Sequence, residues 1–197
     1  MTTPRNVAIL IFDDVEVLDF CGPFEVFAVT GTYDDFKPFN VYTVSENPGP
    51  VIARNGLSIT PSYTIADCPT PDILVVPGGF GTRREMNNKL LLDWIIHQAE
   101  PAELLLSVCT GSLLLANARL LDGLNATTHW GAIDLLKELA PQANVHENTR
   151  YLDNGKVITS AGISAGIDMS LHVVARLLGP EKAAETARYM EYDYWQG

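Results

Sequence analysis

The sequence predicts a single α/β domain in which helices cover both faces of a mostly parallel sheet. Continuous apolar runs, which are typical of strands buried on both faces, alternate along the chain with segments of helical spacing. Such alternation favours parallel strands joined by helical crossovers. No low-complexity linker or internal repeat divides the 197 residues, so we expect residues 1–197 to form one domain.

The first half of the chain provides most of the predicted sheet. Apolar runs predict buried strands over residues 7–12, 39–44, 72–76 and 104–108. Helical spacing predicts helices over residues 18–29 and 89–99, with Pro23 as a candidate first residue of the former. The pair Asn55-Gly56, between two strand-like arms, predicts a hairpin over residues 51–60.

The second half continues the alternation. A short strand is predicted over residues 125–128, and Thr128 is a suitable N-cap for a helix that runs to Leu139. The pair Asn154-Gly155 predicts a second hairpin, over residues 151–159. Helices are predicted over residues 164–178 and 181–192, separated by Gly179-Pro180.

Composition excludes several classes of function. A net charge of −11 argues against a nucleic-acid or anionic-membrane surface, and the apolar runs are shorter than a membrane span. Three cysteines without metal-like spacing, and an N-terminus without signal-peptide form, indicate a cytoplasmic protein that lacks a disulfide framework and a metal site. Residues 78–81 form no P-loop and the first β–α turn lacks G-x-G-x-x-G, so we expect no cofactor.

Cys109 occupies the most informative position in the chain. It stands between a predicted strand and a predicted helix, with the small residues Ser107 and Gly111 two positions to either side. This is the pattern of a nucleophile elbow, whose sharp turn leaves no room for bulky neighbours. A helix N-terminus favours thiolate over thiol, so the pattern predicts a reactive cysteine. The alternative is a buried structural cysteine.

Other candidate groups follow neighbouring strands. Because sites in open α/β sheets lie beyond the carboxyl ends of the strands, we expect residues 13–22, 77–81 and 109–112 to converge. Asp19, in an apolar segment, is either a helix cap or a partly buried acid with a raised pKa that is suited to proton transfer. Gly78 and Gly79 either form an oxyanion hole or make a plain tight turn.

Two further residues complete the candidate site. The backbone N–H of Thr110 is a natural second oxyanion donor, and its hydroxyl can orient a substrate or water. His129, at a predicted strand–helix junction, is either the base of a Cys–His pair or a packed histidine hydrogen-bonded near the site.

Five motifs resemble those of the ThiJ/PfpI superfamily, and most closely its isonitrile hydratase branch. In the order of that superfamily, they lie at residues 18–23, 76–79, 107–112, 126–130 and 161–168. The resemblance implies a flavodoxin-like fold of the class I glutamine amidotransferase type. It implies that Cys109 is the nucleophile, that Asp19 is the acid–base carboxylate, and that Thr110 and Gly79 surround the reacting centre.

The resemblance carries further expectations. The segment that contains Gly162 and Ile163 would line the pocket through its backbone, and the protein would form a homodimer. Protease-like members have histidine where this chain has Thr110, which argues against peptidase activity. The same Cys-Thr-Gly-Ser segment occurs in regulators fused to a DNA-binding module, whereas this acidic chain is expected to be free-standing.

The leading functional hypothesis is therefore a lyase that hydrates isonitriles, small-molecule substrates, to N-substituted formamides. A second hypothesis is glyoxalase- or deglycase-like action on reactive carbonyls, which needs the same thiolate and carboxylate. A third, of a different class, is a cysteine redox sensor or ligand-binding domain without turnover, linked to transcription through a partner.

Overall fold

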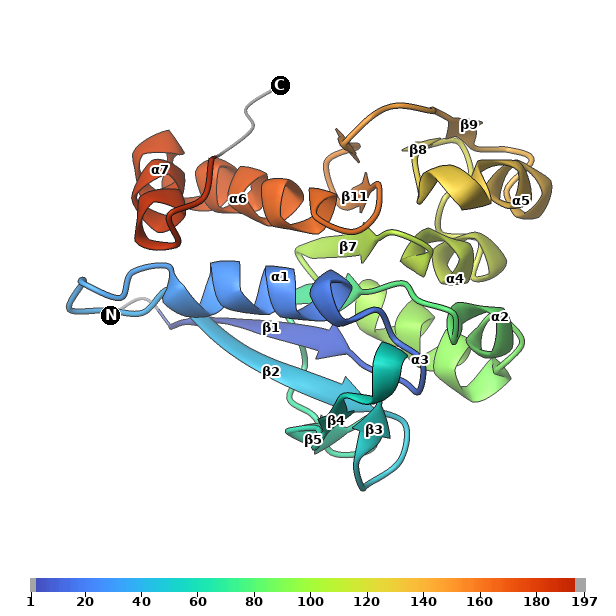
Figure 1. The fold of residues 1–197 in the computed structure, drawn as a ribbon, viewed down its shortest axis with the longest axis horizontal. Coiled ribbons are helices and arrows are strands. Elements are labelled where there is room, and N and C mark those ends of the chain that lie inside the picture. The colour runs from blue at the N-terminus through green and yellow to red at the C-terminus, as the bar shows by residue number, and fades with distance from the viewer. Residues whose placement is uncertain (1–2, 194–197) are drawn as a thin grey trace.

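The computed structural model describes residues 3–193 and contains a seven-stranded central sheet (Figure 1). In spatial order its strands are β10 (Tyr151–Asp153), β11 (Val157–Ser160), β7 (Leu104–Val108), β6 (Ile73–Val76), β1 (Arg5–Leu10), β2 (Phe39–Ser45) and β5 (Tyr63–Thr64). All neighbours are parallel except β10 and β11, which form the predicted Asn-Gly hairpin. The mostly parallel sheet is thus confirmed.

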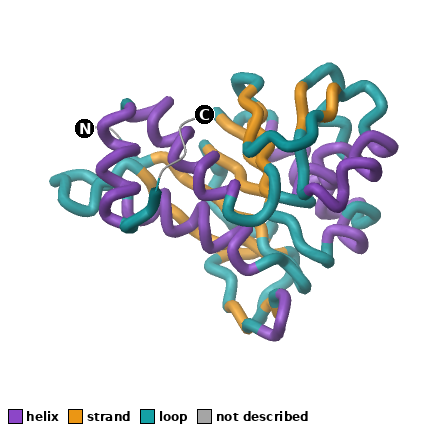
Figure 2. The backbone as a smooth tube through the Cα atoms, turned by 45° about the horizontal axis from the view of Figure 1, so that its top comes forward, coloured by secondary structure: helices purple, strands orange, loops and turns teal. Residues whose placement is uncertain are grey.

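Helices surround this sheet (Figure 2). The long helices α1 (Val17–Val29), α6 (Ala165–Leu178) and α7 (Pro180–Tyr189) lie side by side (Figure 1). The chain moves across the sheet in opposite directions from β1 to β2 and from β6 to β7. Connections between parallel strands are right-handed, so two connections that run in opposite directions lie on opposite faces of the sheet. The helix α3 (Lys89–Ala99), between β6 and β7, therefore covers the face opposite α1.

The remaining elements are short. They are α2 (Thr82–Glu85), α4 (Gly111–Asn117), α5 (Ile133–Leu139), and two-stranded ribbons made by β3 (Val51–Ile52) with β4 (Ser58–Ile59) and by β8 (Asn125–Ala126) with β9 (Asn144–Val145). The first ribbon is the predicted hairpin, and its turn residues Asn55 and Gly56 have φ values of 62° and 90°. Such conformations are what asparagine and glycine tolerate best.

Two local predictions were wrong. Pro23 is not the first residue of α1 but lies inside it, because the helix already begins at Val17. Thr128 does not cap a helix: its hydroxyl donates to the Cys109 carbonyl, and His129 caps the 3₁₀ turn over residues 130–132. In the second case a tertiary contact at the carboxyl edge of the sheet outweighs a local preference.

The core lies between the sheet and its helices. Residues 7–11 of the first strand region and residues 73–76 of β6 are completely buried. Burial on both faces explains why these strands read as continuous apolar runs. Their carboxyl ends open into the loops that carry the candidate site.

Candidate active site

Three loops meet at the carboxyl edge of the sheet, as the sequence predicts. An isolated bridge joins Val15 to Gly79. The Gly78 N–H donates to Asp19 Oδ2 at 3.1 Å, and the Gly79 N–H donates to Thr110 Oγ1 at 3.0 Å. The loops after β1, β6 and β7 are therefore held together by hydrogen bonds that involve the candidate residues themselves.

Cys109 occupies a strained elbow between β7 and α4. Its φ of 55° is uncommon for a residue other than glycine and is typical of functional turns. A side chain at Gly111 would lie 2.0 Å from the Val76 carbonyl oxygen, and Ser107 is completely buried. The small neighbours are therefore needed, as the elbow pattern predicts. Cys109 itself is only 5% exposed.

Asp19 is an acid buried in the first turn of α1. The residue is completely buried, and Oδ1 has no hydrogen-bond partner within the described part of the chain. Burial raises the pKa of Asp19 from its ordinary value of 3.8 to about 7, against the lowering effects of Cys109 and of the Gly78 N–H. Two interpretations were open for Asp19. The structure supports the acid with a raised pKa, because no side chain caps the N-terminus of α1.

Asp19 and Cys109 form a coupled pair. Burial raises the pKa of Cys109, and the nearby Asp19 charge raises it further, whereas the Thr110 N–H lowers it. Two anions in so dry a site repel each other strongly, so the pair keeps at least one proton at neutral pH. The helix N-terminus alone was expected to favour a thiolate, but burial and the carboxylate outweigh it in the free protein.

The glycines of the site have a structural task. A side chain on Gly78 would lie 2.5 Å from the Thr110 nitrogen, and one on Gly79, whose φ is 126°, would lie 2.4 Å from the Asp14 oxygen. Their N–H groups already bind Asp19 and Thr110. In this structure both glycines therefore position the acid and the hydroxyl, rather than offering free oxyanion donors.

His129 lies near the nucleophile without a hydrogen bond to it. Its Nδ1 accepts from the Gly131 N–H at 3.1 Å, which places the hydrogen of the neutral ring on Nε2. A side chain on Gly162 would lie 2.6 Å from His129 Cδ2 and 2.9 Å from Cys109 Sγ. Of the two interpretations of His129, the geometry favours the packed, hydrogen-bonded histidine, with Nε2 as a donor.

A pocket of about 250 Å³ adjoins this corner of the site. Gly162 and Thr128, both in contact with Cys109, belong to its wall, together with the exposed Trp130 and the charged Arg150. Ile163 is half-buried in the turn that follows Gly162. The predicted segment thus lies beside Cys109, whereas Arg150 was not among the predicted site residues.

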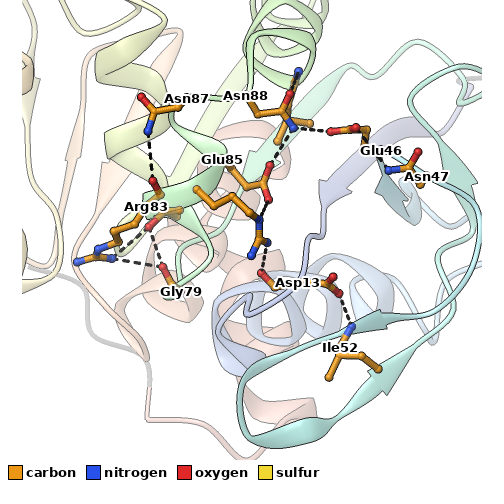
Figure 3. A network of polar contacts seen from close by, with 12 residues as sticks. Asp13, Glu46, Asn47, Ile52, Gly79, Arg83, Glu85, Asn87 and Asn88 are labelled. Carbon is orange, nitrogen blue, oxygen red and sulfur yellow. Dashed lines mark hydrogen bonds and ion pairs between the residues drawn. The ribbon is translucent and has the colours of Figure 1, made fainter.

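Sequence reasoning also missed α2, because four residues are too few for a helical pattern. Thr82, its first residue, is completely buried and lies 3.2 Å from Thr110 Oγ1. Arg83 reaches back to the Gly79 carbonyl at 3.3 Å (Figure 3). In the sequence, the polar Thr-Arg-Arg run resembles an ordinary solvated turn, so only the tertiary structure identifies these neighbours.

Residues 3–193 contain no group of three or more His, Cys, Asp or Glu side chains that could hold a metal ion. Over the same residues, every helix is too short or too polar to cross a membrane.

A second, larger pocket of about 490 Å³ lies at the ends of β1 and β2, and none of the predicted site residues lines it.

Comparison with known proteins agrees with this geometry. A model of the DJ-1/PfpI family matches residues 5–176. This chain belongs to the DJ-1/PfpI family. A ThiJ/PfpI family protein from Pseudomonas syringae superposes with a TM-score of 0.88 at 31% identity, covering 98% of this chain and 77% of that one. DJ-1beta of Drosophila melanogaster shares the fold at 21% identity, with a TM-score of 0.82 over 98% of this chain and all of the other.

Named relatives within the DJ-1/PfpI family differ in function. The isonitrile hydratase of Pseudomonas putida is 37% identical over 95% of this chain and 78% of its own length. The transcriptional regulator CdhR of Pseudomonas aeruginosa is 36% identical over 74% of this chain but only 43% of its own length. The family therefore includes both an enzyme and regulators, so the function of this chain has to be inferred from the residues of its site.

Proposed function

We propose that this DJ-1/PfpI protein hydrates isonitriles to N-substituted formamides, with Cys109 as nucleophile and Asp19 as acid and base. The observation that supports this proposal is a buried carboxylate beside a buried thiol, each with a raised pKa. Isonitrile hydration requires a soft nucleophile and a group that delivers a proton to carbon. The similarity to the Pseudomonas putida enzyme supports the same reaction.

The first step forms a covalent adduct. Asp19 takes the thiol proton of Cys109, and the thiolate sulfur attacks the terminal isonitrile carbon. The same carbon then receives the proton from Asp19, which gives a thioimidate, R–N=CH–S–Cys109, and returns Asp19 to its carboxylate form. A pKa of about 7 suits Asp19 for taking and giving a proton near neutral pH.

The second step releases the product. Asp19 deprotonates a water molecule, whose oxygen attacks the thioimidate carbon, and then passes that proton to the nitrogen. The Thr110 hydroxyl would donate a hydrogen bond to that nitrogen as charge develops on it. Asp19 next takes the hydroxyl proton of the tetrahedral adduct while the carbon–sulfur bond breaks and a formamide, R–NH–CHO, leaves. Transfer of this proton from Asp19 to the Cys109 sulfur restores the starting state. Overall one water is added and no cofactor is consumed.

The hypothesis is tested by measuring formamide production from an aryl isonitrile with the wild type, Cys109→Ala and Asp19→Asn. Turnover by the wild type and its loss in both variants would support the assignment. Formamide production by Cys109→Ala would refute it. A wild type that makes no formamide but consumes methylglyoxal would favour the reactive-carbonyl alternative. Sulfinic acid on Cys109 after mild peroxide, without turnover of either substrate, would favour the redox sensor.

Further proposals rest on the family resemblance. We expect a homodimer in the cytoplasm, acting on a small molecule rather than on nucleic acid. Light scattering of the purified protein measures the first expectation, and localisation of a tagged chain measures the second. Peptidase activity is not expected, and a casein digestion assay checks this.

A further inference from the structure

We propose that Thr82 is a positioning residue that keeps the hydroxyl hydrogen of Thr110 available to the substrate. This inference deepens the proposed function, because it assigns the Thr110 hydroxyl the role of donor to the reacting nitrogen. Within residues 3–193, Thr82 makes no hydrogen bond to Cys109 or Asp19, so it would act only through Thr110 and Gly79.

Thr82 lies at the centre of a small buried hydrogen-bond cluster. Its hydroxyl donates to the Gly79 carbonyl oxygen at 2.7 Å, the usual length of a strong O–H···O bond. Its Oγ1 accepts from Arg83 Nη1 at 3.1 Å and lies 3.2 Å from Thr110 Oγ1. Both threonines therefore face the same carbonyl group, and both are almost completely buried.

The number of hydrogens decides which bonds can form together. Each hydroxyl has one hydrogen, and a carbonyl oxygen accepts two hydrogen bonds. The Gly79 carbonyl oxygen receives the Thr82 hydroxyl at 2.7 Å, and Arg83 Nη1 and the Thr82 N–H at 3.3 Å each. The Thr110 hydroxyl also donates to this oxygen, but at 3.2 Å, which is longer than a usual O–H···O bond, so the short bond from Thr82 outcompetes it.

Thr110 is meanwhile held from its other side. Its Oγ1 accepts the Gly79 N–H at 3.0 Å, which fixes the oxygen while the hydroxyl hydrogen is held only by the long bond to the Gly79 carbonyl. That hydrogen can donate to a substrate beside Cys109. Without the Thr82 hydroxyl, the Gly79 carbonyl would lose its shortest donor, and the hydrogen of Thr110 would turn toward the carbonyl and away from the substrate.

The position of Thr82 is fixed by a network behind α2 (Figure 3). Arg84 donates to the Asp13 carbonyl at 2.9 Å and to Glu85 at 2.7 Å. Asn88 Nδ2 donates to Glu85 at 2.9 Å and to Glu46 at 2.5 Å. Arg84 thus ties this one-turn helix to the end of β1, and Asn88 links Glu85 to Glu46 at the end of β2, so Thr82 is held in place by its neighbours.

The test compares Thr82→Val, which keeps the shape and removes the hydroxyl, with Thr82→Ser, which keeps the hydroxyl. For isonitrile turnover we expect kcat of Thr82→Val to fall about tenfold or more, with KM nearly unchanged, because the interaction acts on the transition state. Thr82→Ser should stay within about twofold of the wild type. Equal activity of Thr82→Val and wild type would overturn the proposal.

A double variant distinguishes positioning from general structural damage. If Thr82 acts through Thr110, Thr82→Val combined with Thr110→Val should be no slower than Thr110→Val alone. Independent, multiplying losses would contradict the proposal. The pH dependence of Cys109 alkylation should be the same in Thr82→Val and wild type, since Thr82 contacts neither member of the proton-sharing pair.

A readout without turnover keeps this inference separate from the proposed reaction. In a crystal structure of Thr82→Val, the distance between Thr110 Oγ1 and the Gly79 oxygen should shorten from 3.2 Å. An unchanged distance would overturn the positioning role. A wild type that makes no formamide would refute isonitrile hydration. The distance between Thr110 Oγ1 and the Gly79 oxygen would still test the positioning role by itself.

Discussion

Replacing Asp19 by asparagine should make the protein more stable at alkaline pH, although it removes the proposed acid–base group. The amide has nearly the same shape and cannot ionise. In the wild type the folded state holds the Asp19 proton with a pKa of about 7, whereas the unfolded chain holds it with the ordinary value of 3.8. The folded state therefore binds more protons between these values, and wild-type stability falls as pH rises through that window.

The size of the effect follows from the shift. A rise from 3.8 to about 7 corresponds to a destabilisation of about 4 kcal/mol at high pH, absent below pH 3.8 and complete above pH 7. About 2.5 kcal/mol of it develops between pH 5 and pH 8. No discount for solvent screening applies, since Asp19 is completely buried. Asp19→Asn should thus gain about that much relative to wild type over this range.

Urea denaturation at half-unit intervals from pH 5 to pH 8 measures the free energy of unfolding of both proteins. Glu138→Gln, a change to an exposed carboxylate on α5, is the matched control and should show no such divergence. A constant difference between wild type and Asp19→Asn across the range would refute the reasoning, and so would a difference that shrinks as pH rises. Either result would mean that Asp19 is ionised in the folded protein throughout.

Three further outcomes are expected. Cys109→Ser should lower isonitrile turnover by at least about a thousandfold, while Cys21→Ser, a half-buried cysteine of α1, retains it. Gly162→Ala should lower kcat and cost about 1–3 kcal/mol of stability, because the added methyl would lie 2.9 Å from Cys109 Sγ; an unaffected variant would mean that the loop yields freely. Arg150→Met should destabilise by about 3 kcal/mol in urea denaturation, since it removes the ion pair to the completely buried carboxylate of Asp168, and a loss below about 1 kcal/mol would contradict this.

Much of the fold was determined locally and could be predicted from the sequence. Buried strands such as β7 are continuous apolar runs, α3 has the bounds that its periodicity predicts, and both Asn-Gly pairs make the expected hairpins. The elbow at Cys109 was equally readable, because a sharp turn restricts the residues beside it. In each case the cause lies within a few residues of its effect.

Other parts of the fold depended on distant partners. The two-residue strands β5 and β9 exist only because a neighbouring strand pairs with them, and α2 is held by contacts with β1 and β2 rather than by its own sequence. Thr128 binds the Cys109 carbonyl for the same reason. No window along the chain contains these contacts.

The sequence by itself determined the chemical groups of the site and the edge of the sheet where they meet, because both follow from strand order and from the elbow. Only the tertiary structure decided their states. Complete burial gives Asp19 its raised pKa, the Gly78 and Gly79 amides hold the carboxylate and the hydroxyl, and Thr82 occupies the Gly79 carbonyl. Protonation and hydrogen-bond direction depend on the dielectric and on the partners around each atom, and those come from parts of the chain far apart in sequence.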